Sequence, residues 1–199
     1  VVSAPQIFIN TGAESIIPDI PGVDKPFVYT STELLDRMTQ PKQLAIIGGG
    51  YIGLEFASTY AKLGTKVTVF ERGDALLARE DPAIARAATE ALQAQGIEIV
   101  FSVDVTAIEG GSTATIRTAN HDDYAGYDAV LMATGRRPAT MGLNLPAAGV
   151  VTDERGAIVV DETLRTSRSH IWAMGDVTGG PQFTYVSLDD FRIVRSQLL

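Results

Sequence analysis

The stretch Leu44–Glu71, LAIIGGGYIGLEFASTYAKLGTKVTVFE, constrains the fold of this chain more than any other. It opens with an apolar run at 44–47, which is typical of a buried parallel strand. A G-x-G-x-x-G sequence follows, formed by Gly48, Gly50 and Gly53, and then a segment with small residues once per helical turn. A second apolar run, 66–70, ends on Glu71. This order predicts a strand–helix–strand unit.

Each glycine of the motif has a physical role in binding a dinucleotide. Gly48 allows the tight turn, Gly50 lets backbone approach a pyrophosphate, and Gly53 lets the helix lie close to the sheet. Glu71 lies 18 residues beyond Gly53, close to the roughly 20 that separate motif and acid in dinucleotide folds. The alternative, glycines that serve only packing, leaves the charged residue at the strand end unexplained.

The composition excludes several classes of function. A net charge of −8 disfavours nucleic acid and anionic membrane as partners, because both require a basic surface. No apolar run approaches the ~20 residues of a membrane span, and we expect a cytoplasmic protein. The chain has no cysteine, so it offers no disulfide, thiolate nucleophile or redox pair, and its two histidines have no metal-site spacing. We therefore predict no catalytic and no metal-binding residue within this chain.

The regions around the motif predict further elements. Before it, residues 6–10 are strand-like, and Ser31–Met38 predicts a short helix capped by Ser31 or Thr32. After it, Asp81 and Pro82 predict a helix start and Gly96 its end. Residues 97–101 predict a third strand. The runs 103–108 and 113–118 predict an antiparallel hairpin, and 127–133 a buried strand.

The last part of the chain predicts a separate section. Residues 158–160 and 171–174 are strand-like, Gly175-Asp176 follows at once, and 187–199 predicts a helix. Together the patterns predict an α/β protein with a Rossmann-like parallel sheet and an antiparallel β-meander layer.

Three signatures, in this order, resemble the class I pyridine nucleotide–disulfide oxidoreductases, the family of dihydrolipoamide dehydrogenase, glutathione reductase and mercuric reductase. They are the motif GGGYIGLE at 48–55, ATGRRP at 133–138 and TSRSHIWAMGD at 166–176. The run GGPQFTYVSLDDFRIV resembles a bacterial branch of the family linked to oxidant and copper stress.

The resemblance implies an internal fragment of an FAD-dependent enzyme. In the family, a nicotinamide domain is inserted into a flavin domain, and the flavin's own glycine-rich turn, the redox cysteines and a catalytic histidine lie elsewhere. We expect residues 1–39 to be a flavin-domain strip with a crossing linker. Residues 40–150 are then the NAD(H)-binding domain, and 151–199 a partial C-terminal strip of the FAD domain. The isolated chain is expected to be inactive.

The resemblance also implies roles for residues of the nicotinamide domain. Glu71 would accept hydrogen bonds from the adenosine ribose and repel a 2′-phosphate, which favours NAD(H) over NADP(H). Arg72 beside it opposes this preference, because an arginine accommodates that phosphate. The alternative for Arg72 is a solvated charge at the rim of the site with no part in binding. Tyr51 resembles an aromatic gate over the flavin, and Glu55 a residue at the nicotinamide–flavin junction. Their alternatives are an ordinary aromatic and a solvated helix acid.

The remaining implied contacts are of two kinds. Those to the nicotinamide coenzyme include motif residue Ile52, Val105 against the adenine, and the turn Gly135-Arg136, which would touch both cofactors. Those to FAD are Thr11, Gly12 and Asp176. The alternative for Asp176 is that it caps a helix.

Three functions stay open from the sequence. The first is the oxidoreductase portion described above, with NADH and the remaining parts of the parent flavoenzyme as partners. Open strand edges in 151–199 can also pair with a second copy, which gives a homodimer. The second is a non-catalytic NAD-binding sensor or regulatory module. The third is a complete small dehydrogenase, which would usually carry a Tyr-x-x-x-Lys pair or a catalytic histidine.

Overall fold

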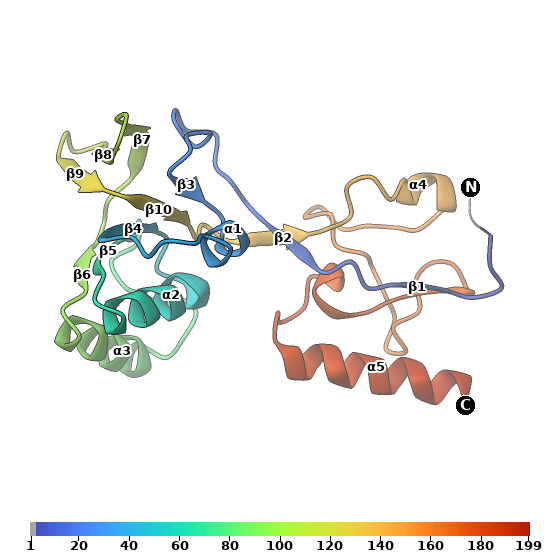
Figure 1. Ribbon diagram of the computed structural model, residues 1–199. Helices are drawn as coiled ribbons and strands as arrows, with labels where there is room; N and C mark the ends of the chain where they lie inside the picture. The colour runs from blue at the N-terminus through green and yellow to red at the C-terminus, as the bar shows by residue number, and fades with distance from the viewer. Residues whose placement is uncertain (1–2) are drawn as a thin grey trace. The chain divides into compact units, whose positions relative to one another are not determined.

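The computed structural model describes residues 3–199, and these form two compact units (Figure 1). The central unit is Ser15–Gly135. The flanking unit joins the described residues up to Glu14 with Arg136–Leu199. Strands β2 (Ala13–Ser15) and β11 (Arg136–Pro138), where the chain leaves and re-enters the flanking unit, pair with each other.

The central unit is built on a five-stranded parallel sheet with the order β3-β10-β4-β5-β6. Its strands are β3 (Val28–Tyr29), β4 (Gln43–Ile47), β5 (Lys66–Phe70), β6 (Glu98–Val100) and β10 (Ala129–Met132). The central strands are buried on both faces, which explains their continuous apolar sequence. The predicted Rossmann-like parallel sheet is confirmed.

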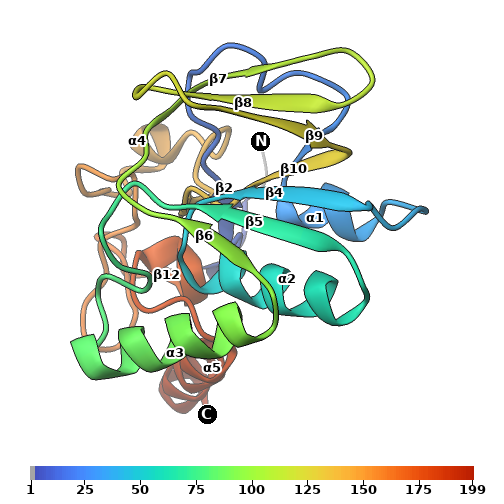
Figure 2. The same cartoon turned by 90° about the vertical axis from the view of Figure 1, so that its left-hand side faces the viewer.

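Side chains of β4 alternate between two separate cores. Leu44 and Ile46 pack in the core that also holds Leu54 and Leu92 of the helices. Ala45 and Ile47 pack in a second core on the opposite face. Figure 2 shows the two layers: helices cover one face of the sheet and a small antiparallel sheet covers the other.

Three helices form the first layer: α1 (Ser31–Leu35), α2 (Tyr51–Lys62) and α3 (Pro82–Ala94). The Asp81 carboxylate accepts from the Ala83 N–H at 2.7 Å, so the predicted start of α3 is confirmed. The predicted cap of α1 is wrong. Thr30 is the N-cap, because it forms a reciprocal capping box with Glu33 that Ser31 and Thr32 cannot make from inside the helix.

The second layer is the antiparallel sheet β7-β8-β9, with β7 (Val105–Glu109), β8 (Ala114–Thr118) and β9 (Asp123–Tyr127). The predicted hairpin is confirmed as β7 and β8. The prediction that one strand covers 127–133 is wrong: Tyr127 ends β9, and β10 begins at Ala129. Asp128 separates the two strands: its N–H donates to the Gln43 carbonyl at 2.9 Å, and its carboxylate accepts from the N–H groups of Lys42 and Gln43.

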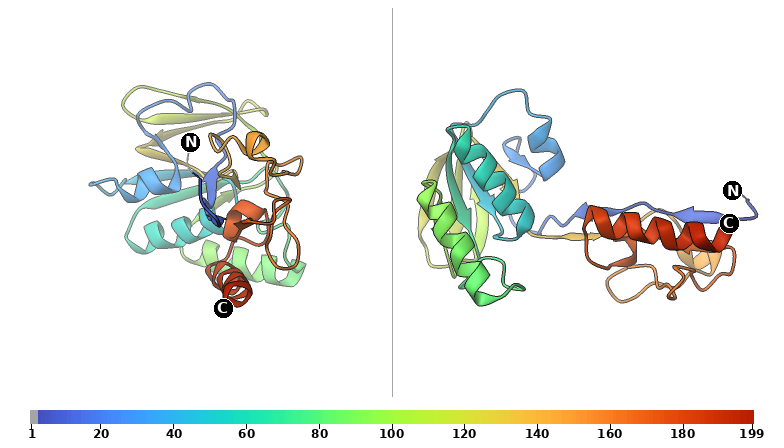
Figure 3. Two further views of the ribbon diagram at one scale, coloured as in Figure 1. Left: turned by 90° about the vertical axis from the view of Figure 1, so that its right-hand side faces the viewer. Right: turned by 90° about the horizontal axis from the view of Figure 1, so that it is seen from below.

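The flanking unit holds a parallel pair, β1 (Ile7–Ile9) and β12 (Ile171–Ala173), with Phe8 opposite Trp172. Its helical parts are α4 (Leu145–Ala148), the 3-10 helix η1 (Gly175–Thr178) and α5 (Thr184–Leu198). Figure 3 shows α5 in red, which packs its buried Val194 against Trp172 and Met174.

Two predictions in the flanking unit are wrong in detail. Residues 158–160 form no strand, and only Ile158 makes a single bridge, to Thr152, because its backbone N–H is used by Val177 instead. The last helix begins at Thr184, three residues earlier than predicted.

Candidate dinucleotide-binding site

The glycine-rich turn lies where the strand order of the sheet reverses. β4 has β5, its successor through α2, on one side, and the much later β10 on the other. The turn after β4 therefore meets the end of β10: a Cβ on Gly48 would collide with the Ala133 carbonyl. Such a switch point at the carboxyl ends of parallel strands is where open α/β sheets bind their ligands.

The three glycines of the motif meet different demands. Gly48 has φ +112° besides its contact with Ala133, so a side chain is excluded there. A Cβ on Gly53 would strike the Gly48 carbonyl, so this glycine lets α2 pack on the turn. Gly50 differs: it has φ −83° and ψ 179°, and a Cβ there would meet no atom within 4 Å. Nothing in the protein itself requires glycine at 50.

The amino end of α2 is open at the same place. Gly50 is its N-cap and is exposed, and as a glycine it has no side chain to make a capping hydrogen bond. The first N–H groups of a helix lack partners within it and carry partial positive charge. An uncapped helix start beside a glycine with free space offers room and donors for a pyrophosphate.

Glu71 leaves the end of β5 and reaches the glycine turn. One carboxylate oxygen accepts from the Gly49 N–H at 2.6 Å, and the other from the Gly73 N–H at 2.7 Å. Two carboxylate oxygens offer about four acceptor positions, so these bonds leave capacity for two ribose hydroxyls. The side chain is half-buried, which fixes it at the edge of the turn.

Arg72 is engaged in an ion pair that the sequence did not predict. Its Nε lies 2.8 Å from Asp104 Oδ1. Two backbone bonds flank the pair: Val103 N–H donates to the Glu71 carbonyl at 3.2 Å, and Ser102 N–H to the Gly73 carbonyl at 2.9 Å. The sequence did contain a hint of this pair. Arg72 follows β5 and Asp104 follows β6, and the carboxyl ends of these parallel neighbours lie at the same edge of the sheet. Val105, which begins β7, is next to Asp104.

Tyr51 and Glu55 lie on the first turns of α2 and line a largely apolar hollow of about 500 Å³ between α2 and α3. Both side chains are exposed. The Tyr51 hydroxyl donates to Glu80. Ile52 follows in the same turn and is half-buried.

The predicted Gly135-Arg136 turn falls at the boundary of the two units. In the central unit, Gly135 has φ +121° and its carbonyl accepts from the Ile16 N–H at 2.9 Å. In the flanking unit, the Arg136 guanidinium donates to the Ala13 carbonyl, and Arg137 Nε lies 2.7 Å from Glu14 Oε1.

The predicted flavin contacts meet at one edge of the β1–β12 pair. Because the strands are parallel, Thr11-Gly12 and Gly175-Asp176 both follow their carboxyl ends. Thr11 Oγ1 donates to the Ala139 carbonyl at 2.8 Å. The Gly175 N–H donates to Asp190 Oδ2 at 2.8 Å, and Asp176 itself is half-buried in η1. The structure thus groups the predicted residues into two sets, one in each unit.

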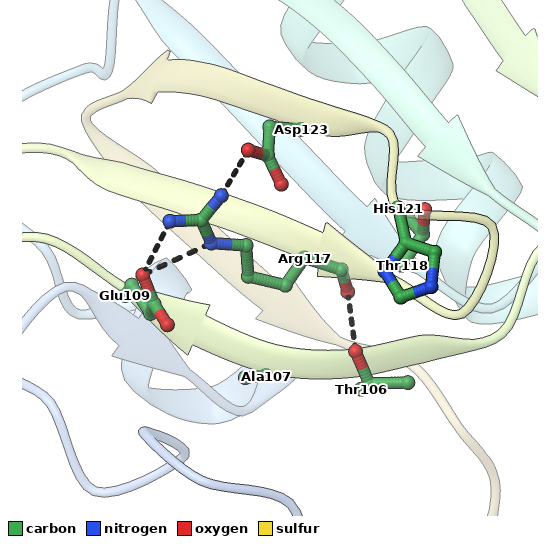
Figure 4. A pocket seen from close by; sticks show the side chains of 7 residues that line it. All are labelled: Thr106, Ala107, Glu109, Arg117, Thr118, His121 and Asp123. Atoms are coloured by element: carbon green, nitrogen blue, oxygen red, sulfur yellow. Dashed lines mark hydrogen bonds and ion pairs between the residues drawn. The ribbon is translucent and has the colours of Figure 1, made fainter.

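A second hollow, of about 470 Å³, lies on the outer face of the antiparallel sheet (Figure 4). At its centre Arg117 pairs with both Glu109 and Asp123, and the hydrogen bonds that the guanidinium donates to these carboxylates raise its pKa. The single cation is thus neutralised by two acids. Two carboxylates against one guanidinium disfavour an anion, so this hollow is the weaker candidate for a phosphate ligand.

Among residues 3–199, no helix combines the length and apolar character that crossing a membrane requires.

Comparisons with known proteins agree with this geometry. Residues 1–190 match the family described as pyridine nucleotide-disulphide oxidoreductase. The chain is 49% identical over its whole length to the probable pyridine nucleotide-disulfide oxidoreductase RclA of Escherichia coli, covering 45% of that protein. It is 41% identical over 189 residues to mercuric reductase of Bacillus cereus, covering 30% of it.

Solved structures show the same similarity. The Cu(II) complex of the HOCl-induced flavoprotein disulfide reductase RclA from E. coli superposes with a TM-score of 0.92 over 98% of this chain and 45% of that one. LpdA from Mycobacterium tuberculosis, 26% identical, gives 0.87 over 97% of this chain and 42% of that one. The chain therefore spans less than half the length of the relatives it matches.

Proposed function

The chain belongs to the pyridine nucleotide-disulphide oxidoreductase family, and from this membership we propose that it is the portion of a flavin-dependent member that binds NAD(H). One observation carries the proposal. Gly50 has open space around it at the uncapped start of α2, on the switch point of the sheet. A glycine that its own protein does not require is explained by a ligand that approaches the backbone closely.

In this proposal the residues of the central unit bind and orient the coenzyme. The N–H groups at the start of α2 receive the pyrophosphate, and Glu71 accepts from the adenosine ribose hydroxyls with its remaining lone pairs. Ile52, Val105 and the Gly135 turn are the further proposed contacts, with Tyr51 and Glu55 toward the nicotinamide end. In the proposed parent enzyme, bound NADH supplies a hydride equivalent to flavin.

The flanking unit contributes to flavin binding in the same proposal. Thr11, Gly12, Arg136 and Asp176 are the proposed side contacts, and a single G-x-G-x-x-G in the sequence leaves the flavin pyrophosphate without an anchor in this chain. The proposed partners are the remaining parts of the parent flavoenzyme, with a homodimer as its assembly. We place this enzyme in the cytoplasm, where NADH is held.

The experiment is a calorimetric titration of the 199-residue chain with NADH and with NADPH. We expect NADH to bind in the micromolar-to-millimolar range and NADPH more weakly. Glu71→Gln removes the charge and keeps one acceptor oxygen, so it should narrow the affinity gap between the two coenzymes, while one of the two N–H groups loses its acceptor. Glu71→Ala narrows the gap too, but it also leaves two N–H groups without their partner. Tighter binding of NADPH than of NADH by the unaltered chain would refute the assignment of Glu71.

A further inference from the structure

Arg72 and Asp104 form an ion pair at the ribose end of the proposed coenzyme site. An arginine directly after the strand-end acid is the residue type that accommodates the 2′-phosphate of NADP(H). Here its Nε is 2.8 Å from the Asp104 carboxylate. The side chains are 78% and 58% exposed, so the pair by itself is weak.

The surrounding backbone fixes the two partners opposite each other. The β5–β6 ladder ends with Phe70 opposite Val100, and the Glu71 N–H donates to the Val100 carbonyl at 2.8 Å. Beyond it, Glu71 and Gly73 accept from Val103 and Ser102, one on each side of Arg72. These backbone bonds hold the segments that carry Arg72 and Asp104 in one register, so their proximity does not depend on the energy of the ion pair.

The charges at this edge also oppose a phosphate. Arg72 is one cation among three carboxylates, those of Glu71, Asp74 and Asp104. A 2′-phosphate that binds the Arg72 Nε would have to displace Asp104, and one that binds the remaining N–H groups of the guanidinium would lie near the Asp104 carboxylate. Either arrangement disfavours NADP(H), whereas a neutral ribose hydroxyl meets neither penalty.

We propose that Asp104 is a second specificity-determining residue, which holds Arg72 away from the 2′-phosphate and so makes the site select NAD(H). This inference rests on the proposed function and extends it from Glu71 to a residue on the neighbouring strand end.

The test uses two probes that lack nicotinamide, ADP-ribose and 2′-phospho-ADP-ribose, titrated calorimetrically into the 199-residue chain. Asp104→Asn keeps the size of the side chain and removes its charge. We expect it to raise the affinity for 2′-phospho-ADP-ribose about three- to tenfold. The affinity for ADP-ribose should stay within about twofold of that of the unaltered chain, because this probe has a neutral hydroxyl in place of the 2′-phosphate.

Two variants separate the pair from general charge. Combining Arg72→Ala with Asp104→Asn should abolish the gain, because the released arginine is its source. Asp74→Asn removes an exposed carboxylate two residues beyond Arg72, and no described residue forms an ion pair with Asp74. It should give a clearly smaller gain than Asp104→Asn.

An unchanged ratio of the two affinities in Asp104→Asn, with ADP-ribose still bound, would overturn the role of Asp104 and leave the proposed function standing. An equal gain from Asp74→Asn would do the same, since it would reduce the effect to net charge. Failure of the unaltered chain to bind ADP-ribose would overturn both proposals at once.

Discussion

Replacing Gly50 with alanine should separate ligand binding from folding. The backbone at 50 has φ −83° and ψ 179°, which any L-residue adopts, and the added methyl group meets no atom within 4 Å. Alanine is a poorer N-cap than glycine by roughly 0.5–1 kcal/mol. Its smaller freedom in the unfolded chain offsets about 0.4–1 kcal/mol of this. We therefore expect a change in the free energy of unfolding within about 0.5 kcal/mol.

Coenzyme binding should respond quite differently. In the proposed site the pyrophosphate occupies the space that the new methyl group would fill, so contact between phosphate and the N–H groups of α2 is lost. We expect NADH to bind at least about tenfold more weakly, which corresponds to about 1.4 kcal/mol. Urea denaturation measures the stability, and calorimetric titration with NADH measures the affinity on the same preparation.

Two matched variants control this experiment. Gly111→Ala makes the same change in the turn between β7 and β8, where a Cβ also meets no atom within 4 Å, and should alter neither quantity. Gly48→Ala should instead lower the stability by at least about 2 kcal/mol, because the residue has a positive φ and would collide with the Ala133 carbonyl. Unchanged NADH affinity in a fully folded Gly50→Ala protein would refute the placement of the pyrophosphate at this turn.

Three further expectations concern stability and cofactor content. Leu131→Ala empties a fully buried site in the interior strand β10 and should lower the free energy of unfolding by about 2–5 kcal/mol in urea denaturation; a loss below about 1 kcal/mol would contradict the described core. The backbone N–H and hydroxyl of Thr30 lower the pKa of Glu33 below 4.5, so its stabilisation is present above that pH and is lost as the pH falls through the lowered pKa. Thermal unfolding across that range should show a smaller pH dependence in Glu33→Gln, and an identical dependence would count against the capping box. The purified chain should hold little flavin and reduce no dye with NADH, because it has one glycine-rich phosphate turn; a stoichiometric flavin absorption band would contradict this.

The sequence determined the central unit because its signals are local. Each pattern predicts the local structure of its own segment, as do the apolar runs of four or five residues, the glycines at turns and the Asp81-Pro82 helix start. The order of these segments then leaves few topologies, since parallel crossovers are right-handed. Between Tyr127 and Ala129 the single polar residue, Asp128, did not reveal the break between two strands, because the bonds that turn the chain there, from the Lys42 and Gln43 N–H groups to its carboxylate, exist only in the folded protein.

Only the tertiary structure decided how the site residues meet. Glu71 was predicted from its place at a strand end, but its bond to the Gly49 N–H depends on the pairing of β4 with β5. The sequence left Arg72 between a phosphate ligand and a free rim charge. The structure pairs it with Asp104, 32 residues away, because β5 and β6 end at the same edge of the sheet. A pattern along one segment carries no information about such a partner, since the contact exists only once the strands have paired.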